Sequence, residues 1–389
     1  MTLAFFSILL NHHQLPVADE FFKILGDNYH FVAVMPVVKS ELKGGHDYSN
    51  RPYCIKTYES EAEYKRAMDI ALTADVCVFD GNEVLPFFIA RAKTGKLSFD
   101  LSERWLKRGI LNMLSPRLQK HYWMYICHLR KPSIYKLCAS AFSSHDDNMI
   151  GMYRGKHFKW GYFTHVEDSD VEASSDVSTT NITPLMWCSR YLMWKHPELP
   201  IMAAGRLKDA GYHFVIDMFG SGEYEEKAQR LAKELDVEDV VRFKGNVPNE
   251  QLILEMRKHE IFLFTSDRNE GWGAVANESL ANGCALVASD AIGSAPWLVK
   301  DGKNGFLFRS SNTSCSFDSP DHRSLESLVE KIRWMLDNPE DLQLMRREAT
   351  KVMKEVWSPK VAAERFLILS DNLMKGNGTT FLEGPCSKA

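Results

Sequence analysis

The sequence predicts an α/β protein of two domains, each built around a parallel β-sheet. At 389 residues and 45% hydrophobic content, the chain exceeds the size at which one hydrophobic core keeps growing. Short apolar runs such as Phe31–Val34 and Val76–Phe79 alternate with helix-patterned segments such as Glu59–Leu72. Alternation of this kind is typical of parallel sheets whose strands are joined by helical crossovers.

The first half of the chain contains two further predicted strands, Leu3–Leu10 and Lys96–Phe99. Ligands of parallel sheets bind beyond the carboxyl ends of the strands, so the loops that follow the strands are expected to meet a ligand. A second interpretation of the histidines after the first strand is that they only close a turn. The candidate residues in these loops are His13, Asp80 and Glu103.

The second half repeats the pattern and ends in predicted helices. Amphipathic spacing predicts a helix over Leu325–Leu336 and a final helix over Val361–Met374. The predicted strands, some with the turn that follows, are Pro184–Arg190, Val215–Gly222, Val240–Pro248, Ile261–Phe264 and Ala285–Asp290.

The stretch from Ser266 to Glu278 places two glutamates, Glu270 and Glu278, across a predicted junction between a buried strand and a short helix. Glycines at positions 271 and 273 leave the backbone bare, so a diphosphate could approach the amides of residues 271 to 274 at the positive end of that helix. The two carboxylates can address different parts of one extended ligand, such as sugar hydroxyls and a ribose diol. A structural turn with two solvated glutamates is the plainer alternative.

This stretch, with the following Leu280-Ala281-Asn282-Gly283 and the strand Ala285–Asp290, resembles the retaining glycosyltransferases of family 4, which have the GT-B architecture of two Rossmann-like domains. The resemblance covers most of residues 184 to 310. It implies that Glu270 lies at the donor sugar and that Glu278 holds the nucleotide ribose. Two departures are Trp272, where the family more often has phenylalanine, and Trp297, where many members carry glutamate. Donor-binding candidates in this stretch are Ser266, Gly271, Trp272, Gly273, Ala274 and Glu278.

The resemblance implies a second set of donor contacts in the loops after other strands of the second half. Arg190 and Lys195 resemble the pair with which the family grips the donor pyrophosphate, and such cations would neutralise the departing charge without a metal. A similar pair, Gly205-Arg206, lies inside a predicted helix and is discounted. By resemblance the loops containing Gly220, Gly222, Asn246 and Val247 also face the nucleotide.

The domain boundaries follow from composition and from the resemblance. Residues 1–165 are predicted to form an acceptor-binding domain, and the acidic, serine-rich segment 166–183 a linker. Residues 184–357 are predicted to form the donor-binding domain. Residues 358–389 are expected to supply a terminal helix that packs back on the first domain, followed by a tail of unassigned role.

The segment from Arg104 to Lys136 carries eight basic residues and no acidic one, interleaved with aromatic residues. Residues 1–165 as a whole carry 21 basic and 16 acidic residues. Such a segment is suited to anionic lipid headgroups, where each cation adds ~1 kcal/mol. A solvated basic helical face with buried aromatics is an equal alternative. Nucleic acid is not predicted as a partner, because no recognisable nucleic-acid module accompanies the charge.

The predicted function is transfer of a sugar, with retention of configuration, from a nucleotide diphosphate donor, UDP favoured, to a glycan acceptor that is lipid-linked. Neither a cofactor nor a metal is predicted. A sugar-nucleotide epimerase and a non-catalytic sugar-nucleotide-binding subunit are the alternatives. Eight scattered cysteines and an apolar start without signal-peptide features predict a cytoplasmic protein, peripheral at the inner membrane face.

Overall fold

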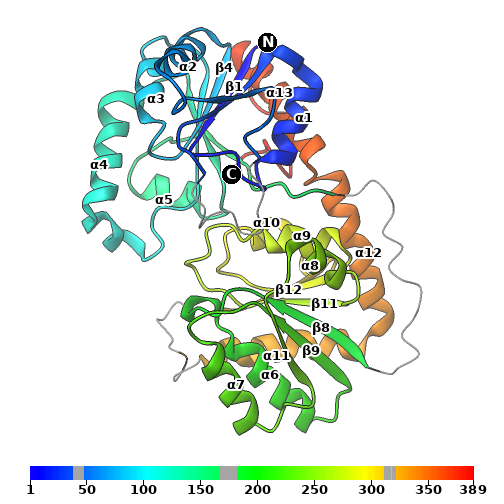
Figure 1. Ribbon diagram of the computed structural model, residues 1–389. Coiled ribbons are helices and arrows are strands. Elements are labelled where there is room, and N and C mark those ends of the chain that lie inside the picture. The colour runs from blue at the N-terminus through cyan, green and yellow to red at the C-terminus, as the bar shows by residue number, and fades with distance from the viewer. Residues whose placement is uncertain (38–47, 167–181, 311–316, 318–320) are drawn as a thin grey trace. The chain divides into compact units, whose positions relative to one another are not determined.

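The computed structural model describes residues 1–37, 48–166, 182–310, 317 and 321–389 (Figure 1). It divides into two compact units: Met1–His165 with Val356–Ala389, and Val166–Glu355. Residues 167–181, most of the predicted linker, lie outside the described residues.

Unit 1 (Met1–His165 with Val356–Ala389) contains a seven-stranded parallel sheet in the order β3-β2-β1-β4-β5-β6-β7. Its central strands are almost fully buried, as is typical of a parallel sheet covered on both faces. The strands are β1 Leu3–Ser7, β2 Tyr29–Ala33, β3 Cys54–Lys56, β4 Val76–Asp80, β5 Ser98–Ser102, β6 Ile134–Cys138 and β7 His157–Lys159.

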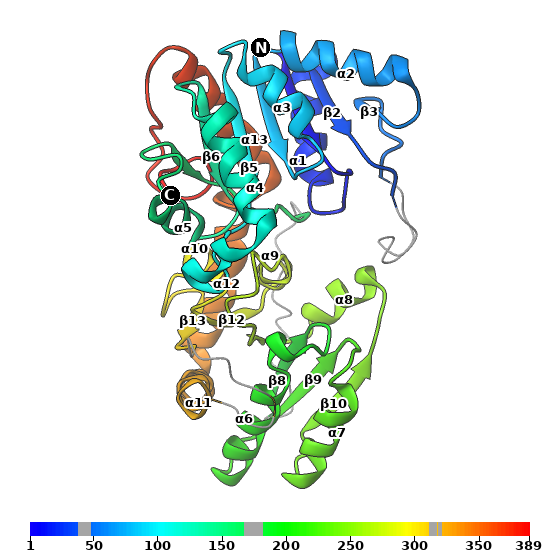
Figure 2. The ribbon, with the colours of Figure 1, turned by 90° about the vertical axis from the view of Figure 1, so that its left-hand side faces the viewer.

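Alternate side chains of these strands serve the two faces of the sheet. Phe6 and Phe79 pack in the cluster that contains helices α2 and α3, which lie together in Figure 2. Phe99 instead contacts Phe366 of α13, which lies beside α1 (Figure 1). The unit's helices are α1 Leu15–Leu25, α2 Glu61–Thr73, α3 Leu85–Ala92, α4 Pro116–Met124, α5 Ser143–Met149 and α13 Pro359–Met374.

The end of the chain completes unit 1. Helix α13 begins at a proline and is capped by Ser358, whose hydroxyl accepts from the Val361 amide. The tail then lies along the edge strand β7: the Cys386 amide donates to the Lys159 carbonyl at 2.8 Å. The tail, to which no role was assigned from the sequence, thus covers part of the edge of β7.

Unit 2 (Val166–Glu355) contains a six-stranded parallel sheet in the order β10-β9-β8-β11-β12-β13. The strands are β8 Thr183–Cys188, β9 Phe214–Phe219, β10 Val241–Gly245, β11 Ile261–Phe264, β12 Ala285–Ser289 and β13 Gly305–Phe308. The helices are α6 Glu198–Asp209, α7 Glu225–Glu234, α8 Asn249–Met256, α9 Val275–Ala281, α10 Ala295–Leu298, α11 His322–Asp337 and α12 Pro339–Glu355.

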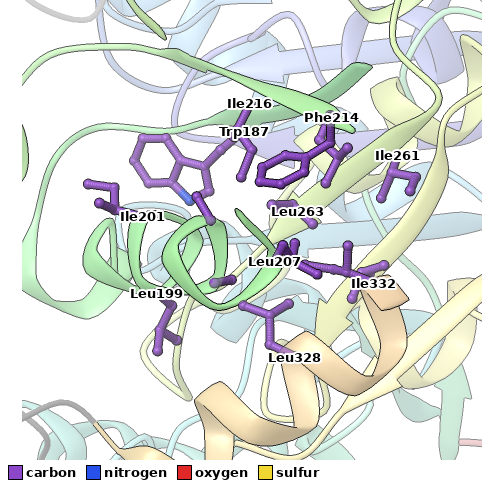
Figure 3. Packing of buried hydrophobic residues seen from close by; sticks show 14 of the residues in the cluster. Trp187, Leu199, Ile201, Leu207, Phe214, Ile216, Ile261, Leu263, Leu328 and Ile332 are labelled. Carbon is purple, nitrogen blue, oxygen red and sulfur yellow. The ribbon is translucent and has the colours of Figure 1, made fainter. Parts of the chain in front are cut away.

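The core of unit 2 joins its sheet to α6 and α11. Leu263 from the sheet, Leu207 from α6 and Ile332 from α11 belong to one buried cluster, and Figure 3 shows them converging. Trp187 of β8 lies in the same cluster, and its Nε1 donates to Thr265 Oγ1 at 2.9 Å, which ties β8 to the end of β11. The predicted class, two α/β domains with parallel sheets, is confirmed.

Strand order fixes where a ligand can enter each unit. In unit 2 the chain passes from β8 to β9 and β10 on one side, then returns to β11 on the other. Unit 1 reverses in the same way between β1 and β4. Loops that leave neighbouring strands in opposite directions open a crevice at the carboxyl ends, which is the usual ligand site of such sheets.

Candidate functional site

Lys195 and Glu270 meet at the switch point of unit 2. Lys195 ends a short turn after β8, and Glu270 lies in the loop after β11, the neighbouring strand. Lys195 Nζ donates to Glu270 Oε2, and Ser266 Oγ donates to the same oxygen at 3.0 Å. The two charged side chains are only 11% and 12% exposed. The structure therefore brings three predicted site residues together, and Ser266 fixes the carboxylate of Glu270.

Arg190 adds a second cation to this cluster. Burial lowers the pKa of Lys195, the carboxylate of Glu270 opposes that effect, and the charge of Arg190 lowers the pKa further. Arg190 lies in the loop that leads into the turn of Lys195: the Leu192 amide donates to the Arg190 carbonyl at 2.8 Å, and the Lys195 amide donates to the Leu192 carbonyl at 2.9 Å. Arg190 is exposed, whereas Lys195 is buried, so the charge of Lys195 is less screened by water. Such a pair can neutralise an anionic leaving group.

His196, which was not among the predicted site residues, links the loop of Lys195 to the loop of Glu270. Its Nδ1 contacts Glu198 Oε1 at 2.7 Å, and its Nε2 lies 3.7 Å from Asp267 Oδ2, in the loop of Glu270. Burial disfavours the charged ring, but hydrogen bonds to Asp267 and Glu198 raise the pKa of His196 to about 10. An imidazolium at neutral pH thus bridges the loop of Lys195 to the loop of Glu270. The backbone of His196 is left-handed, with φ of 51°, where it ends the turn that contains Lys195.

Glu278 lies inside α9 and is buried, 9% exposed. No residue that the structure describes donates a hydrogen bond to its carboxylate, and burial raises the pKa of this carboxyl to about 7. Burial and then the charge of Glu278 raise the pKa of the Cys188 thiol to about 12, which places Glu278 near the end of β8. A buried carboxyl without a protein donor is poised to accept from a ligand hydroxyl.

The glycines after β9 serve the loop of Arg190. Gly220 has φ of +118°, and an added Cβ would lie 1.9 Å from the Ser189 carbonyl oxygen. At Gly222 an added Cβ would lie 2.7 Å from the Tyr191 carbonyl oxygen. These glycines therefore let the strand-end loop approach the backbone on both sides of Arg190. Asn246 Nδ2 donates to Ser221 Oγ at 2.5 Å, so Asn246 borders the same loop, followed by Val247.

Trp272, one of the predicted donor-binding residues, has a buried side chain. Its indole is fully buried, and Nε1 donates to Asn277 Oδ1 at 2.8 Å, so the ring anchors α9. Trp297 packs near it at 6.1 Å between ring centroids. An added Cβ at Gly273 would lie 2.4 Å from the Phe264 ring, so that glycine allows tight packing. Gly271 is buried beside Glu270, and Ala274 is the N-cap of the seven-residue α9. The dipole of so short a helix adds little positive potential to that of the two cations, Arg190 and Lys195.

Unit 1 contains a cavity of about 930 Å³ at the carboxyl ends of β4 and β5. Asp80 and Glu103, two of the predicted acceptor-side residues, both line it. Asp80 Oδ2 accepts from Gln14 Nε2 at 2.7 Å, and burial raises the pKa of Asp80 to about 6. His13 is not among the lining residues, but it contacts Tyr162, which is. The His13 ring stacks on Tyr162, whose hydroxyl donates to Glu103 Oε1 at 3.0 Å.

The floor of this cavity is a polar network that the sequence did not reveal. Asp100 Oδ2 accepts from Lys136 Nζ at 2.8 Å and from the Tyr153 hydroxyl at 2.7 Å. Lys136 also donates to Ser102 Oγ at 2.7 Å and is completely buried. Burial alone would lower the pKa of Lys136, but the charge of Asp100 outweighs burial and raises this pKa. The network orients Asp100 and Ser102, which both line the cavity.

The basic segment from Arg104 to Lys136 is not one surface feature. Arg104 makes a bidentate pair with the buried Asp146, at 3.0 and 3.2 Å. Lys136 lies in β6, inside the sheet. These two cations stabilise unit 1 and cannot contact lipid headgroups, so the membrane interpretation is corrected at both ends of the segment. Along residues 105–135, large apolar side chains are exposed instead: Ile110 (51%), Leu111 (69%), Leu114 (74%) and Trp123 (62%).

Two features are absent from the described residues. Among them, no three His, Cys, Asp or Glu side chains gather as they would around a metal ion. No helix in the described ranges combines the length and apolar character required to cross a bilayer.

Residues 185–352 match the model of the family "Glycosyl transferases group 1". The match begins inside β8 and ends inside α12, so it covers almost all described elements of unit 2. The chain is also similar, over part of its length, to two relatives. The chain is 26% identical over 148 residues to the GtfA subunit of the UDP-N-acetylglucosamine–peptide N-acetylglucosaminyltransferase of Streptococcus gordonii, covering 38% of this chain and 28% of that protein.

It is 25% identical over 170 residues to the putative colanic acid biosynthesis glycosyltransferase WcaL of Salmonella typhimurium, covering 41% of this chain and 42% of that protein. The chain thus aligns with less than half the length of both relatives. Among solved structures, Anabaena HepE in complex with UDP superposes with a TM-score of 0.65 at 15% identity, over 96% of this chain and 100% of that one. The fold is GT-B, and the matches support a glycosyltransferase.

Proposed function

We propose that this chain, whose unit 2 matches the group 1 glycosyl transferases, transfers a sugar from a UDP-sugar to a glycan acceptor with retention of configuration, in the manner of family 4. The observation that carries the proposal is the cluster of Lys195, Glu270 and Arg190 at the switch point of unit 2. UDP is favoured because UDP or a UDP-sugar appears in the names of HepE's complex and of the S. gordonii relative. The name of WcaL supports a role in polysaccharide synthesis.

The two cations would stabilise the diphosphate as it departs. Breaking the glycosidic bond concentrates negative charge on the leaving oxygen, and a buried ammonium stabilises that charge more than the ground state. Arg190 would share the charge from the exposed side of the site. With two cations in place the reaction needs no metal, so we expect transfer to persist in excess EDTA.

Glu270 would orient the donor sugar and not attack it. Its Oε2 already accepts from Lys195 and Ser266, which lowers its power as a nucleophile. The acceptor hydroxyl would then attack the anomeric carbon from the face that the diphosphate leaves and pass its proton to the departing phosphate oxygen, which retains the configuration. Glu278 would accept from the ribose diol, because its buried carboxyl has no donor among the described residues.

The acceptor would occupy the cavity of unit 1. Asp80, Glu103 and Asp100 supply carboxylate oxygens that can accept from sugar hydroxyls, and Trp105 and Tyr162 supply aromatic surfaces for sugar rings. His13 would act through Tyr162 by holding the ring against Glu103. These assignments make Asp80 and Glu103 acceptor-orienting residues.

A panel of nucleotides and donors tests the proposal. Calorimetric titration with UDP, GDP, ADP and CDP should show the tightest binding for UDP, and UDP-sugars should then be consumed with an acceptor. If another nucleoside diphosphate binds more tightly, the proposed nucleobase of the donor is wrong, but the proposed reaction, sugar transfer, stands. If none binds, the assignment of unit 2 as a donor site is wrong.

Donor binding should release most of one proton at pH 6.5. The carboxyl of Glu278 is largely protonated below its pKa of about 7, and it must ionise to accept from both ribose hydroxyls. UDP-glucose suits this test because its two phosphates are diesters that do not titrate near pH 7. Calorimetry in buffers of different ionisation enthalpy measures the proton, and Glu278→Gln should release none. Equal release by both proteins would remove Glu278 from the ribose site.

The same raised pKa predicts a pH-dependent stability without ligand. Neutral Glu278 stabilises the fold below about pH 4.5, its ordinary pKa, and this contribution is lost as the pH rises through about 7. Glu278→Gln should therefore melt above wild type at pH 8 and close to it at pH 5, as thermal unfolding would show. A lower melting temperature of the variant at pH 8 would contradict the cause assigned to the shift.

A lipid-linked acceptor and peripheral attachment at the cytoplasmic membrane face are part of the proposal. Their support is now the exposed apolar group Ile110, Leu111, Leu114 and Trp123, with the exposed cations Arg108 and Lys120 on the same segment. Apolar side chains beside cations favour reversible insertion into an anionic interface.

Anionic vesicles should bind the protein at low salt, and Leu111→Asp/Leu114→Asp should weaken binding at least about 10-fold, since each buried leucine contributes ~1.5 kcal/mol or more. Leu344→Asp, at a leucine of α12 that is 58% exposed, is the control. Co-sedimentation measures binding. If wild-type protein does not bind at low salt, or if both variants bind like wild type, the membrane proposal fails.

A further inference from the structure

The wall of the unit 1 cavity carries more positive charge than an uncharged glycan requires. Lys107, Arg108, Arg117 and His121 all line it. Arg117 and His121 are four residues apart on α4, so they share one face of that helix. Burial lowers the pKa of His121, and the charge of Arg117 lowers it further against the effect of Asp100. A lowered pKa favours the neutral imidazole, so the positive charge of this lining comes from Lys107, Arg108 and Arg117.

Two of these cations have no counter-charge within the described part of the chain. Lys107 pairs with Glu103 at 3.3 Å, and Arg104 is fully engaged by Asp146. Arg108 and Arg117 lie within ion-pair distance of no carboxylate among the residues that the structure describes. The amide oxygen of Asn82, when it faces the guanidinium, accepts from Arg117 at 3.0 Å, but this partner is neutral. The cavity wall thus holds two uncompensated guanidinium groups.

We propose that the acceptor carries a phosphate group, which Arg108 and Arg117 bind, while its hydroxyl groups face the carboxylates of the floor. This inference rests on the proposed function, because it names the class of acceptor for that reaction. Guanidinium groups bind phosphate through paired hydrogen bonds. A phosphate can carry up to two charges and so matches two arginines, whereas a single carboxylate leaves one uncompensated. The hydroxyls would lie against Asp80 and Asp100 on the opposite side.

The phosphate could belong to a lipid-linked sugar diphosphate or to a soluble sugar or polyol phosphate. Leu111 lines the cavity and is 69% exposed, so the mouth adjoins the apolar group that would insert into a membrane. Both sources share the same chemistry at the arginines. The experiment therefore includes a probe of each kind.

Binding is measured by calorimetry in saturating UDP, so that phosphate probes cannot occupy the donor site. The soluble probes are glucose 1-phosphate and glycerol 3-phosphate, each against its unphosphorylated counterpart, and the lipid probe is short-chain prenyl-diphosphate-linked N-acetylglucosamine in detergent. We expect at least one phosphorylated probe to bind at least about 30-fold more tightly than its uncharged counterpart. Binding of soluble probes supports a soluble acceptor, and binding of the lipid probe alone supports a lipid-linked one.

Arg108→Gln/Arg117→Gln should remove this preference and leave UDP affinity unchanged. Arg130→Gln/Lys131→Gln, at exposed cations outside the cavity lining, is the matched control and should behave as wild type. The inference is overturned if phosphorylated and unphosphorylated probes bind alike, or if the Arg108/Arg117 variant retains the preference. Failure of UDP to bind would instead count against the proposed function, and the probes can then be compared without UDP.

Discussion

Replacing Lys195 by alanine should reduce turnover at least about 100-fold, while the affinity for the sugar donor changes much less. In the proposed reaction Lys195, whose side chain is only 11% exposed, stabilises the leaving group, and loss of one preorganised charge stabiliser typically costs 100- to 1,000-fold in turnover. Its effect should be concentrated in the transition state, where the diphosphate gains charge. Steady-state kinetics with a UDP-sugar separates the two parameters.

The matched control is Lys233→Ala, at an exposed lysine in the last turn of α7. Arg190→Ala should cost less than Lys195→Ala, because water screens the exposed guanidinium. A loss below threefold for Lys195→Ala would remove this residue from the reacting centre. A greater loss for Arg190→Ala than for Lys195→Ala would reverse the roles assigned to the two cations.

Glu270→Ala and Glu278→Ala should have opposite signatures. Glu278→Ala should weaken UDP binding about 10-fold or more, since hydrogen bonds to a charged group contribute ~1.5–3 kcal/mol. Glu270→Ala should leave UDP affinity within a few fold and abolish detectable transfer, because Glu270 positions only the sugar. Calorimetry with UDP and a transfer assay on both variants measure these effects.

Conservative variants distinguish positioning from folding. Glu270→Gln can still accept from Ser266 but loses the ion pair with Lys195. It should fold like wild type, judged by thermal unfolding, and remain nearly inactive. Equal losses of UDP affinity in the two alanine variants would contradict the division of roles between sugar and ribose.

That Lys195, Glu270 and Ser266 come together was predictable from the sequence, because these residues are local to strand ends. Glu270 and Ser266 follow one short apolar strand, and Arg190 and Lys195 follow another. Parallel sheets place such loops along one edge, so sequence position implies proximity. Gly205-Arg206 was discounted correctly, since both residues lie inside α6. The contribution of His196 was hidden, because one of its two partners, Asp267, is distant in sequence and follows another strand.

The acceptor side was predicted less well, because its chemistry lies inside strands. Lys136 was counted with a surface charge run, but it lies in β6 and bonds Asp100 of β5. A lysine within Ile134–Cys138 interrupts the apolar pattern that marks a buried strand, so β6 was missed. The predicted strand Lys96–Phe99 stops before Asp100 for a similar reason, because a charged residue interrupts the apolar pattern. Asp100 nevertheless lies within the observed strand, Ser98–Ser102.

Trp272 shows a different limit of the sequence. A tryptophan next to Glu270 is compatible with an exposed loop position or with core packing. Only the three-dimensional structure shows that its ring is buried and bonded to Asn277. The side-chain direction of one loop residue depends on the turn geometry, which the residue pattern alone does not fix.

Acceptor-dependent release of UDP tests the central claim most directly. Wild-type protein is incubated with a UDP-sugar, with and without acceptor, and the released UDP and the remaining donor are quantified together. A transferase should release UDP in step with acceptor glycosylation, and Lys195→Ala should suppress that release at least about 100-fold. Binding of UDP without release under either condition would indicate a sugar-nucleotide-binding subunit, and conversion of the donor sugar without acceptor would indicate an epimerase. Either result would contradict the account.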